Sequence, residues 1–160
     1  MKKIILAALA VAAFGVQAAD EGAYVGLNTN HAKFTCDGCV GVSGNAVGIY
    51  GGYRKGNIAG EVAHFQKTIS DVDVTITDVS VIPYINVAKD VDVLGKLGVR
   101  HSSGKDSTLE TSGTSLVIGA GVEYTFTPQV TARAMVDYSS KTFGESTKTT
   151  TTTLGVAYKF

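Results

Sequence analysis

Two residues in this sequence have types and a spacing that could support nucleophilic chemistry. His101 and Ser103 are two positions apart, and in a β-strand that spacing places both side chains on one face. A serine hydroxyl beside a histidine base is the arrangement of acyl-transfer enzymes. No acid that could orient His101 is evident, because Glu123 falls on the opposite face of its own strand. We therefore read the pair as a strand end that leads into a polar loop, and we expect no catalytic residue.

A second grouping is the pair Cys36 and Cys39, which are separated by two residues in a polar stretch. A metal or redox site would need further ligands, and His31 is the only candidate nearby. In an exported protein two such cysteines are more simply explained by a disulfide, although so short a closed loop adds little stability. We predict a disulfide between Cys36 and Cys39, and neither a metal nor a cofactor.

The start of the chain has the features of a secretory signal peptide. Lys2 and Lys3 precede an apolar run over residues 4–16, and small residues follow it. The run is about 13 residues long, which is shorter than the roughly 20 that a spanning helix needs. The sequence therefore predicts that residues 1–19 are a cleaved leader and that residues 20–160 form one domain.

Charge and composition narrow the classes of protein. The chain carries 14 basic and 14 acidic residues, and loss of the two leader lysines leaves a small acidic excess. This balance predicts no nucleic-acid partner. Only 2 prolines and as many as 19 glycines, with abundant valine and threonine, fit an all-β chain. Since no later apolar run approaches the length of a spanning helix, a membrane location would require a closed β-barrel.

Eight segments alternate in polarity with a period of two, which is the pattern of β-strands. The alternation is clear at the C-terminus, where Leu154, Val156, Tyr158 and Phe160 are separated by small or polar residues. The pattern predicts strands over residues 22–30, 45–54, 58–66, 79–87, 91–101, 114–126, 130–138 and 150–160.

The predicted connections alternate in length. Three of them, at residues 55–57, 88–90 and 127–129, are tight turns, and the other four are long and polar. Short turns at one end and long loops at the other are typical of outer-membrane barrels. In the fourth strand Pro83 predicts a break in the ladder, and a change in the phase of the apolar residues predicts a bulge near Asp78.

Six ionisable residues fall in the middle of predicted strands, on the face opposite the aliphatic stripe. The interior of an eight-stranded barrel is just wide enough for side chains, so three acids and three bases would neutralise one another there. We therefore predict that the aliphatic face contacts lipid and that an ion-pair network fills the lumen. The alternative is a soluble periplasmic lipocalin-like carrier with the charges in water. The six residues are Glu61, Lys96, Arg100, Glu123, Arg133 and Asp137.

Several motifs resemble one known family of proteins. They are GAYVGL at 22–27, GIYGGYR at 48–54, IGAGVEYTFTPQVTARAMVDY at 118–138 and VAYKF at 156–160. With these motifs the chain resembles the small outer-membrane β-barrels of Gram-negative bacteria, which include the transmembrane domain of outer-membrane protein A and the opacity-type, porin-family surface proteins.

This resemblance implies a fold and a set of partners. The fold would be all-β, an eight-stranded antiparallel up-and-down transmembrane barrel in the outer membrane, its lumen closed by the six charged residues above. The resemblance also implies insertion by the outer-membrane assembly machinery, with Tyr158 and Phe160 in the C-terminal recognition signal.

The expected function is that of a surface protein, with a structural or adhesive role and no enzymatic activity. We expect a monomer that contacts outer-membrane lipids and lipopolysaccharide, with serine- and threonine-rich loops available to an extracellular ligand. A lipid-modifying enzyme is the second alternative, because His101 and Ser103 are similar to the His-x-Ser pair of the outer-membrane lipid A deacylases. The residues around the pair differ from that family.

Overall fold

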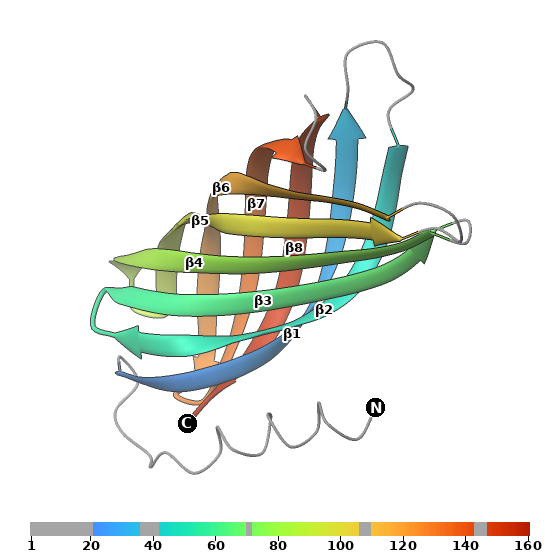
Figure 1. Ribbon diagram of the computed structural model, residues 1–160. Coiled ribbons are helices and arrows are strands. Elements are labelled where there is room, and N and C mark those ends of the chain that lie inside the picture. Colours follow the sequence, from blue (N-terminus) through green and yellow to red (C-terminus); the bar gives the residue numbers. More distant parts are fainter. Residues whose placement is uncertain (1–20, 36–41, 70–71, 106–109, 143–146) are drawn as a thin grey trace.

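The computed structural model describes residues 21–35, 42–69, 72–105, 110–142 and 147–160, and every structural statement below concerns these residues. Each strand is antiparallel to its neighbours, and the strands follow one another around the barrel in chain order (Figure 1). Among these ranges there is no helix long and apolar enough to cross a membrane. The strands are β1 (Glu21–Thr35), β2 (Val42–Lys55), β3 (Ile58–Ile69), β4 (Val72–Ala88), β5 (Val91–Lys105), β6 (Glu110–Thr127), β7 (Val130–Thr142) and β8 (Thr147–Lys159).

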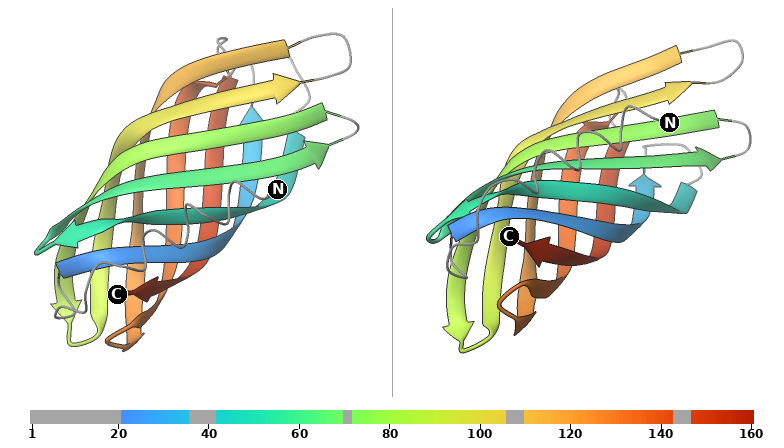
Figure 2. Two further views of the ribbon diagram at one scale, coloured as in Figure 1. Left: turned by 60° about the horizontal axis from the view of Figure 1, so that its bottom comes forward. Right: turned by 90° about the horizontal axis from the view of Figure 1, so that it is seen from below.

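The first and last strands close the sheet into a barrel. Tyr24 lies opposite Lys159 at one end of the β1–β8 ladder, and Thr35 lies opposite Lys148 at the other end. The C-terminus therefore lies beside the beginning of β1, and all strands are strongly tilted around the barrel (Figure 2). The predicted fold class, an eight-stranded antiparallel up-and-down barrel, is confirmed.

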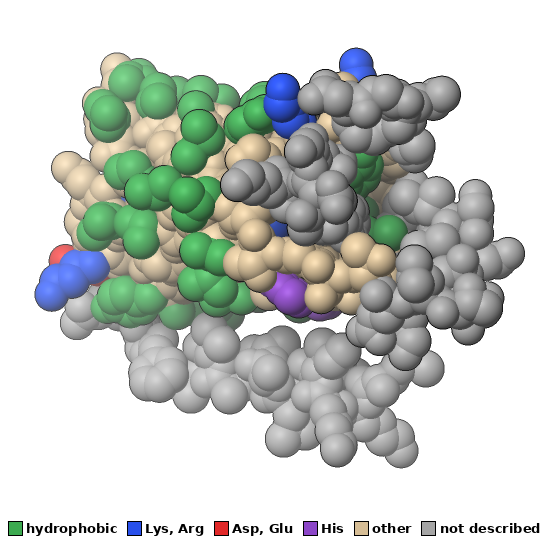
Figure 3. All heavy atoms as spheres, turned by 45° about the horizontal axis from the view of Figure 1, so that its top comes forward, with side chains coloured by type: hydrophobic (Ala, Val, Ile, Leu, Met, Phe, Trp, Pro, Cys, Tyr) green, Lys and Arg blue, Asp and Glu red, His purple; other side chains and the backbone are tan. Residues whose placement is uncertain are grey.

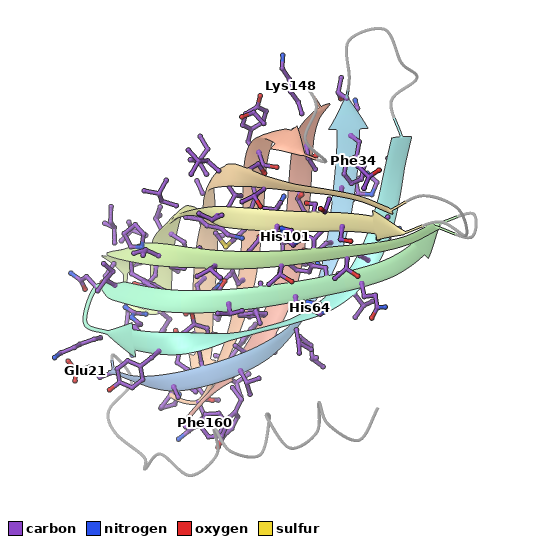
Figure 4. The ribbon with its side chains drawn as sticks, in the orientation of Figure 1. Glu21, Phe34, His64, His101, Lys148 and Phe160 are labelled. Atoms are coloured by element: carbon purple, nitrogen blue, oxygen red, sulfur yellow. The ribbon has the colours of Figure 1, made fainter. Side chains whose placement is uncertain are left out.

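Three two-residue turns connect β2 to β3, β4 to β5 and β6 to β7 at the same end of the barrel. In the first turn Gly56 has a φ of 58°, a left-handed conformation that glycine adopts without steric cost. Figure 4 labels Glu21 and Phe160 at this end, and Phe34 and Lys148 at the opposite end.

The barrel wall has an apolar outer face and a polar inner face. The outward side chains Leu27, Val47 and Leu116 are 65%, 70% and 68% exposed, and apolar side chains spread over the visible outer surface (Figure 3). On the inner face Arg100 is 1% exposed and Glu123 is 2% exposed. An apolar surface of this extent requires a lipid environment. The burial excludes the soluble carrier, which would need an aliphatic interior.

Aromatic rings mark the short-turn end of the apolar surface. Tyr124 and Phe126 pack edge to face with ring centroids 4.8 Å apart, and Tyr158 and Phe160 do so at 5.2 Å. Amphipathic aromatic side chains are favoured at the level of the lipid headgroups. We therefore place one membrane boundary here, and we assign this end to the periplasm because the short turns of outer-membrane barrels lie there.

The strands continue past the apolar belt at the extracellular end, where the sequence pattern predicted long loops. The ladder extends into all four of these segments, and Ser103, for example, pairs with Thr75 on β4 and Ser112 on β6. The alternation is lost there because outward side chains beyond the lipid are also polar. Backbone hydrogen bonding does not depend on that alternation, so the strands persist where the pattern ends.

The predicted bulge near Asp78 is wrong. The β3–β4 ladder passes through this position without a shift in register. Val74 and Ile76 share the inner face with Asp78, so the change of phase in the sequence reflects an inner wall that becomes apolar toward the extracellular end. The break predicted at Pro83 is confirmed as a gap in the β4–β5 pairing without a change of register, because proline has no N–H to donate.

A charged side chain introduced on the outer face tests whether that face of the barrel wall contacts lipid. Val122 is 49% exposed near the middle of the apolar run of β6, and Val122→Arg is expected to lower the free energy of unfolding in lipid vesicles by about 2–4 kcal/mol. The measurement is urea-induced unfolding of the refolded protein. Thr150→Arg, at an outward position of β8 beyond the belt, is the control and should cost only about 0–1 kcal/mol. Equal losses would contradict the assigned lipid face.

Candidate functional site: the polar lumen

The periplasmic half of the lumen is organised around the guanidinium group of Arg133. Its Nη1 donates to Glu61 Oε2 at 2.5 Å, and its Nη2 and Nε donate to Glu123 Oε2 at 3.0 and 3.2 Å. The same Nη2 donates to the Tyr84 hydroxyl oxygen at 2.9 Å. Lys159 Nζ pairs with the other oxygen of Glu123 at 3.1 Å. These side chains, from five different strands, form what we call the periplasmic layer.

Aromatic rings enclose the periplasmic layer. The Tyr24 hydroxyl donates to Glu61 Oε2 at 2.8 Å, and the Tyr24 and Tyr50 rings meet edge to face at 6.2 Å. The Arg133 guanidinium lies 5.0 Å from the centre of the Tyr50 ring and 5.7 Å from that of Tyr24. The rings thus fill the space around the charges and add cation–π attraction.

A further ion pair lies at the periplasmic mouth. Arg54 Nη1 donates to Asp92 Oδ2 at 2.9 Å, and Arg54 Nε donates to the carbonyl oxygen of Gly56 at 2.8 Å. The guanidinium lies 3.9 Å from the centre of the Tyr84 ring, and Asn86 donates to Asp92 Oδ1 at 3.1 Å. Both oxygens of the Asp92 carboxylate therefore have partners.

The extracellular half of the lumen contains a second group, the extracellular layer. Arg100 donates from Nε and Nη2 to the two oxygens of Asp78, each at 2.8 Å. Lys96 Nζ donates to Asp78 at 2.9 Å and to Asp137 at 3.1 Å. Arg100 Nη2 also lies 3.6 Å from Asp137 Oδ2, and its Nη1 donates to the Thr151 hydroxyl at 3.2 Å. Two cations and two carboxylates are thus cross-linked across the barrel.

The two layers enclose a small cavity. It has a volume of about 20 Å³, and it is bounded by Glu61 and Arg133 on one side and by Lys96 and Asp137 on the other. Such a volume holds about one water molecule. The described part of the lumen is therefore a packed polar core at this level.

The structure places all six charged residues predicted from parity in the lumen, and each makes at least one ion pair. Sequence reasoning treated them as one network, whereas the structure separates them into two layers. Glu61, Glu123 and Arg133 belong to the periplasmic layer, and Lys96, Arg100 and Asp137 to the extracellular layer.

Four further charged residues of the lumen were missed. Asp78 was assigned to a loop and a bulge. Its spacing of two residues from Ser80 indicates that both side chains face the lumen, and this could have identified it. Arg54, Asp92 and Lys159 lie on the inner parity of their strands but close to strand ends, where solvent was the simpler expectation. With these four, the ion pairs join five cations to five carboxylates.

Glycines on the inner face make room for the large side chains of the lumen. A Cβ atom at Gly26 would lie 2.4 Å from Cζ of Tyr50 and 2.6 Å from the carbonyl oxygen of Val156. The Tyr50 ring cannot easily withdraw, because it is 3% exposed and packed against Tyr24 and Arg133. Substitution of this glycine is therefore an overpacking change.

Gly26→Ala is expected to lower the free energy of unfolding by about 1–3 kcal/mol, the usual range for an overpacked core. The control is Gly60→Ala, because nothing lies within 4 Å of a Cβ atom at Gly60, and its expected effect is within about 0.5 kcal/mol of zero. Urea unfolding of both variants in the same detergent measures the difference. Similar stability of the two variants would show that the Tyr50 ring is not held in place.

Among the described residues, no hydrogen bond joins His64 or His101 to Ser103. His101 is exposed on the outer face, and its Nδ1 lies 3.1 Å from the hydroxyl of Thr114 instead of a carboxylate. His64 makes the equivalent contact to Thr77 at 3.0 Å, and Figure 4 labels both histidines. The two contacts are cross-strand pairs of a kind that stabilises sheets.

Two further groups of predicted site residues stay predictions. Cys36 and Cys39 lie outside the described residues, so their disulfide stays a prediction. Tyr158 points outward into the aromatic boundary, and Phe160 donates its backbone N–H to the carbonyl oxygen of Ala23 at 2.9 Å. Among the described ranges there is no group of three or more His, Cys, Asp or Glu residues that could hold a metal ion.

Comparison with known proteins gives consistent matches. The family model of the outer membrane protein beta-barrel domain matches residues 4–160. The chain is similar to Ail, the attachment invasion locus protein of Yersinia pestis, with a TM-score of 0.68 and 23% identity over 88% of this chain and 99% of that chain. A structure of Ail in complex with the heparin analogue sucrose octasulfate gives a TM-score of 0.68 and 21% identity over the same shares of the two chains.

Neisserial surface protein A gives a TM-score of 0.65 and 24% identity over 87% of this chain and 97% of that chain. No curated protein sequence matches this chain. At these identities, similarity to the solved structures shows a shared barrel fold.

Proposed function

This chain belongs to the outer membrane protein beta-barrel family and lies in the outer membrane, and we propose that it is a non-enzymatic surface protein that acts through its extracellular strand ends. The observation that carries the proposal is the packed lumen. Two layers of buried ion pairs block the barrel axis, and the cavity between them measures about 20 Å³. A barrel filled in this way offers no path for nutrients, so its interactions take place on its surface.

The extracellular ends of β1 and β8 form a polar surface that fits such a role. Lys33 and Lys148 are both exposed. Lys33 lies opposite Thr150 and Lys148 lies opposite Thr35, so the two lysines are diagonal neighbours about 7–8 Å apart. Hydroxyl and ammonium donors together suit an anionic carbohydrate or a lipopolysaccharide phosphate.

Ail supplies a probe for this surface. Ail, which has the same barrel fold, forms a complex with the heparin analogue sucrose octasulfate. For the present chain we propose attachment to an anionic glycan at Lys33 and Lys148. Whether the natural ligand is a host glycan or lipopolysaccharide is decided by comparing the two as competitors.

The test is binding of sucrose octasulfate to the refolded barrel in detergent, followed by calorimetry. The double variant Lys33→Gln and Lys148→Gln should weaken binding by about tenfold or more, since a hydrogen bond to a charged group contributes roughly 1.5–3 kcal/mol. Lys55→Gln, an exposed lysine at the periplasmic end of β2, is the matched control and should bind as the unmodified chain does. Equal binding by all three proteins would reject the proposed surface.

The lipid-modifying alternative is tested separately. Because His101 contacts Thr114 and not an acid, we propose that Ser103 is not a nucleophile. Lipid A from cells that carry Ser103→Ala should have the same acylation pattern as lipid A from cells with the unmodified protein. A changed pattern would replace the surface-protein proposal with an enzymatic one.

Export and assembly complete the proposal. We propose that residues 1–19 are removed on export, and that the assembly machinery recognises Tyr158 and Phe160, which leads to a monomeric barrel. N-terminal sequencing of the mature protein should begin at Asp20. A Phe160→Ala variant should accumulate in the periplasm without the heat-dependent gel mobility of a folded barrel.

A further inference from the structure

The periplasmic mouth of the barrel opens into a second, larger cavity, which we call the vestibule. Its volume is about 590 Å³, within the range of roughly 300–1,000 Å³ typical of small-molecule sites. The side chains of Arg54 and Asp92 lie at its inner end, and the turn residues Lys89 and Asp90 form part of its rim. The layers of ion pairs above it separate the vestibule from the extracellular side.

The charged groups of the vestibule are held in place before any ligand arrives. The Arg54 side chain is 7% exposed, and it is fixed by Asp92, by the carbonyl oxygen of Gly56 and by the ring of Tyr84. Asp92 is in turn held by Asn86, at 3.1 Å. A preorganised group of this kind loses little entropy when it binds a ligand.

Among Arg54, Asp92 and Lys159, the charged residues of the vestibule that also belong to the lumen, the unused hydrogen-bonding capacity consists of donors. Both oxygens of Asp92 are occupied, by Arg54 and by Asn86. By contrast, Arg54 uses Nε and Nη1, and its Nη2 makes no hydrogen bond to any of the described residues. Lys159 uses its ammonium group for Glu123 alone, although that group carries three N–H donors.

The residues that line the vestibule carry a net positive charge, which favours the same anionic ligands as the free donors. Arg54, Lys89 and Lys159 face the cavity together with Asp90 and Asp92, which leaves an excess of one positive charge. From the geometry we infer that the vestibule is a periplasmic binding site for a small oxyanion, a carboxylate or a phosphate, held by Arg54 Nη2 and the ammonium group of Lys159. This site is independent of the extracellular surface proposed above, and it faces the opposite compartment.

The probes are sodium acetate and inorganic phosphate, each titrated at constant ionic strength against the full chain folded in detergent micelles. The readouts are the NMR signals of the Arg54 Nε–H group and the Asn86 side-chain amide. Arg54→Lys identifies the arginine signal. We expect a saturable shift of both signals with acetate, with phosphate or with both, and none when sodium chloride is added alone.

Two variants distinguish a specific site from general attraction. Lys159→Gln should weaken binding by about tenfold, because it removes a charge-assisted donor. Since Lys159 also supports Glu123, the turn variant Lys89→Gln provides a measurement that does not disturb the lumen, and it should weaken binding by roughly two- to fivefold. Lys33→Gln, at the far end of the barrel, should leave the titration unchanged.

Three results would overturn the inference. They are shifts that grow linearly without saturation, shifts that chloride reproduces, and an affinity that Lys89→Gln and Lys159→Gln leave unaltered. Saturation by acetate but not phosphate would define a carboxylate site, and the reverse result a phosphate site. Heat-dependent gel mobility of each variant confirms that the barrel under study is folded.

Discussion

Replacement of Arg133 by methionine is expected to lower the free energy of unfolding by about 3–5 kcal/mol, the usual cost of removing one partner from a buried ion pair. Arg133 satisfies two carboxylates, Glu61 and Glu123, and both are almost completely buried. Methionine would fill much of the same volume but would leave these carboxylates with Lys159 as their sole cation among the described residues. The loss should therefore come from uncompensated charge and not from a cavity.

The measurement is urea unfolding of refolded Arg133→Met in detergent, with the folded fraction read from gel mobility before and after boiling. A triple variant that also carries Glu61→Gln and Glu123→Gln supplies the control, because it removes the uncompensated charges along with their partner. It should regain more than half of the lost stability. If the triple variant is less stable than Arg133→Met, packing around the arginine and not its charge dominates this layer.

The second large effect is expected from Asp78→Asn in the extracellular layer. Asp78 is 0% exposed, and it accepts hydrogen bonds from Arg100 twice and from Lys96 once. Asparagine keeps the shape but removes the charge, so two buried cations would share Asp137 alone. The expected loss in the free energy of unfolding is again about 3–5 kcal/mol.

A double-mutant cycle separates charge from packing at Asp78. Lys96→Met removes the one surplus positive charge that Asp78→Asn creates, so the combination of the two changes should cost less than the sum of the single variants, by roughly 0.5–3 kcal/mol. Asp90→Asn, in a periplasmic turn, is the matched control and should change stability by less than about 0.5 kcal/mol. Strict additivity in the cycle would mean that Asp78 and Lys96 do not depend on each other.

The two predictions together test whether the lumen is one cooperative unit. Arg133 and Asp78 belong to different layers, and among the described residues no ion pair joins the two layers directly. Their effects on stability should therefore add within about 0.3–0.5 kcal/mol, as distant independent sites do. A clear departure from additivity would indicate that the small cavity between the layers transmits strain.

Much of the fold could be predicted from the sequence because lipid imposes a strict alternation on a barrel wall. Where a strand crosses the lipid, every second side chain must be apolar, and the side chains between them can carry charge. This alternation alone assigned Leu116 to the outer face and Glu123 to the lumen. The three tight turns and the break at Pro83 were also readable, since they depend on local backbone chemistry. The number of strands, their order and the membrane location follow from these local signals.

The extent of the strands and the pairing of the charges could not be read in the same way. Beyond the lipid both faces of a strand are polar, so the alternation that reveals a strand disappears while its hydrogen bonds continue. Asp78 was missed for another reason: the apolar Val74 and Ile76 precede it on the same inner face, which reverses the usual alternation. With Asp78 the main acceptor of Arg100 was missed as well. The alternation along a strand indicates which side of the wall a residue faces, but not which side chain it contacts across the lumen.

The sequence by itself therefore determined the architecture, the two faces of the wall and six of the charges inside it, because these depend on alternation along single strands. Only the tertiary structure decided that the charges form two layers, that tyrosine rings enclose one of them, and that a vestibule opens below. Those features arise where side chains from strands far apart in the chain, such as Glu61 and Arg133, meet at the barrel axis. Their meeting depends on the tilt and register of all eight strands at once, which no single segment encodes.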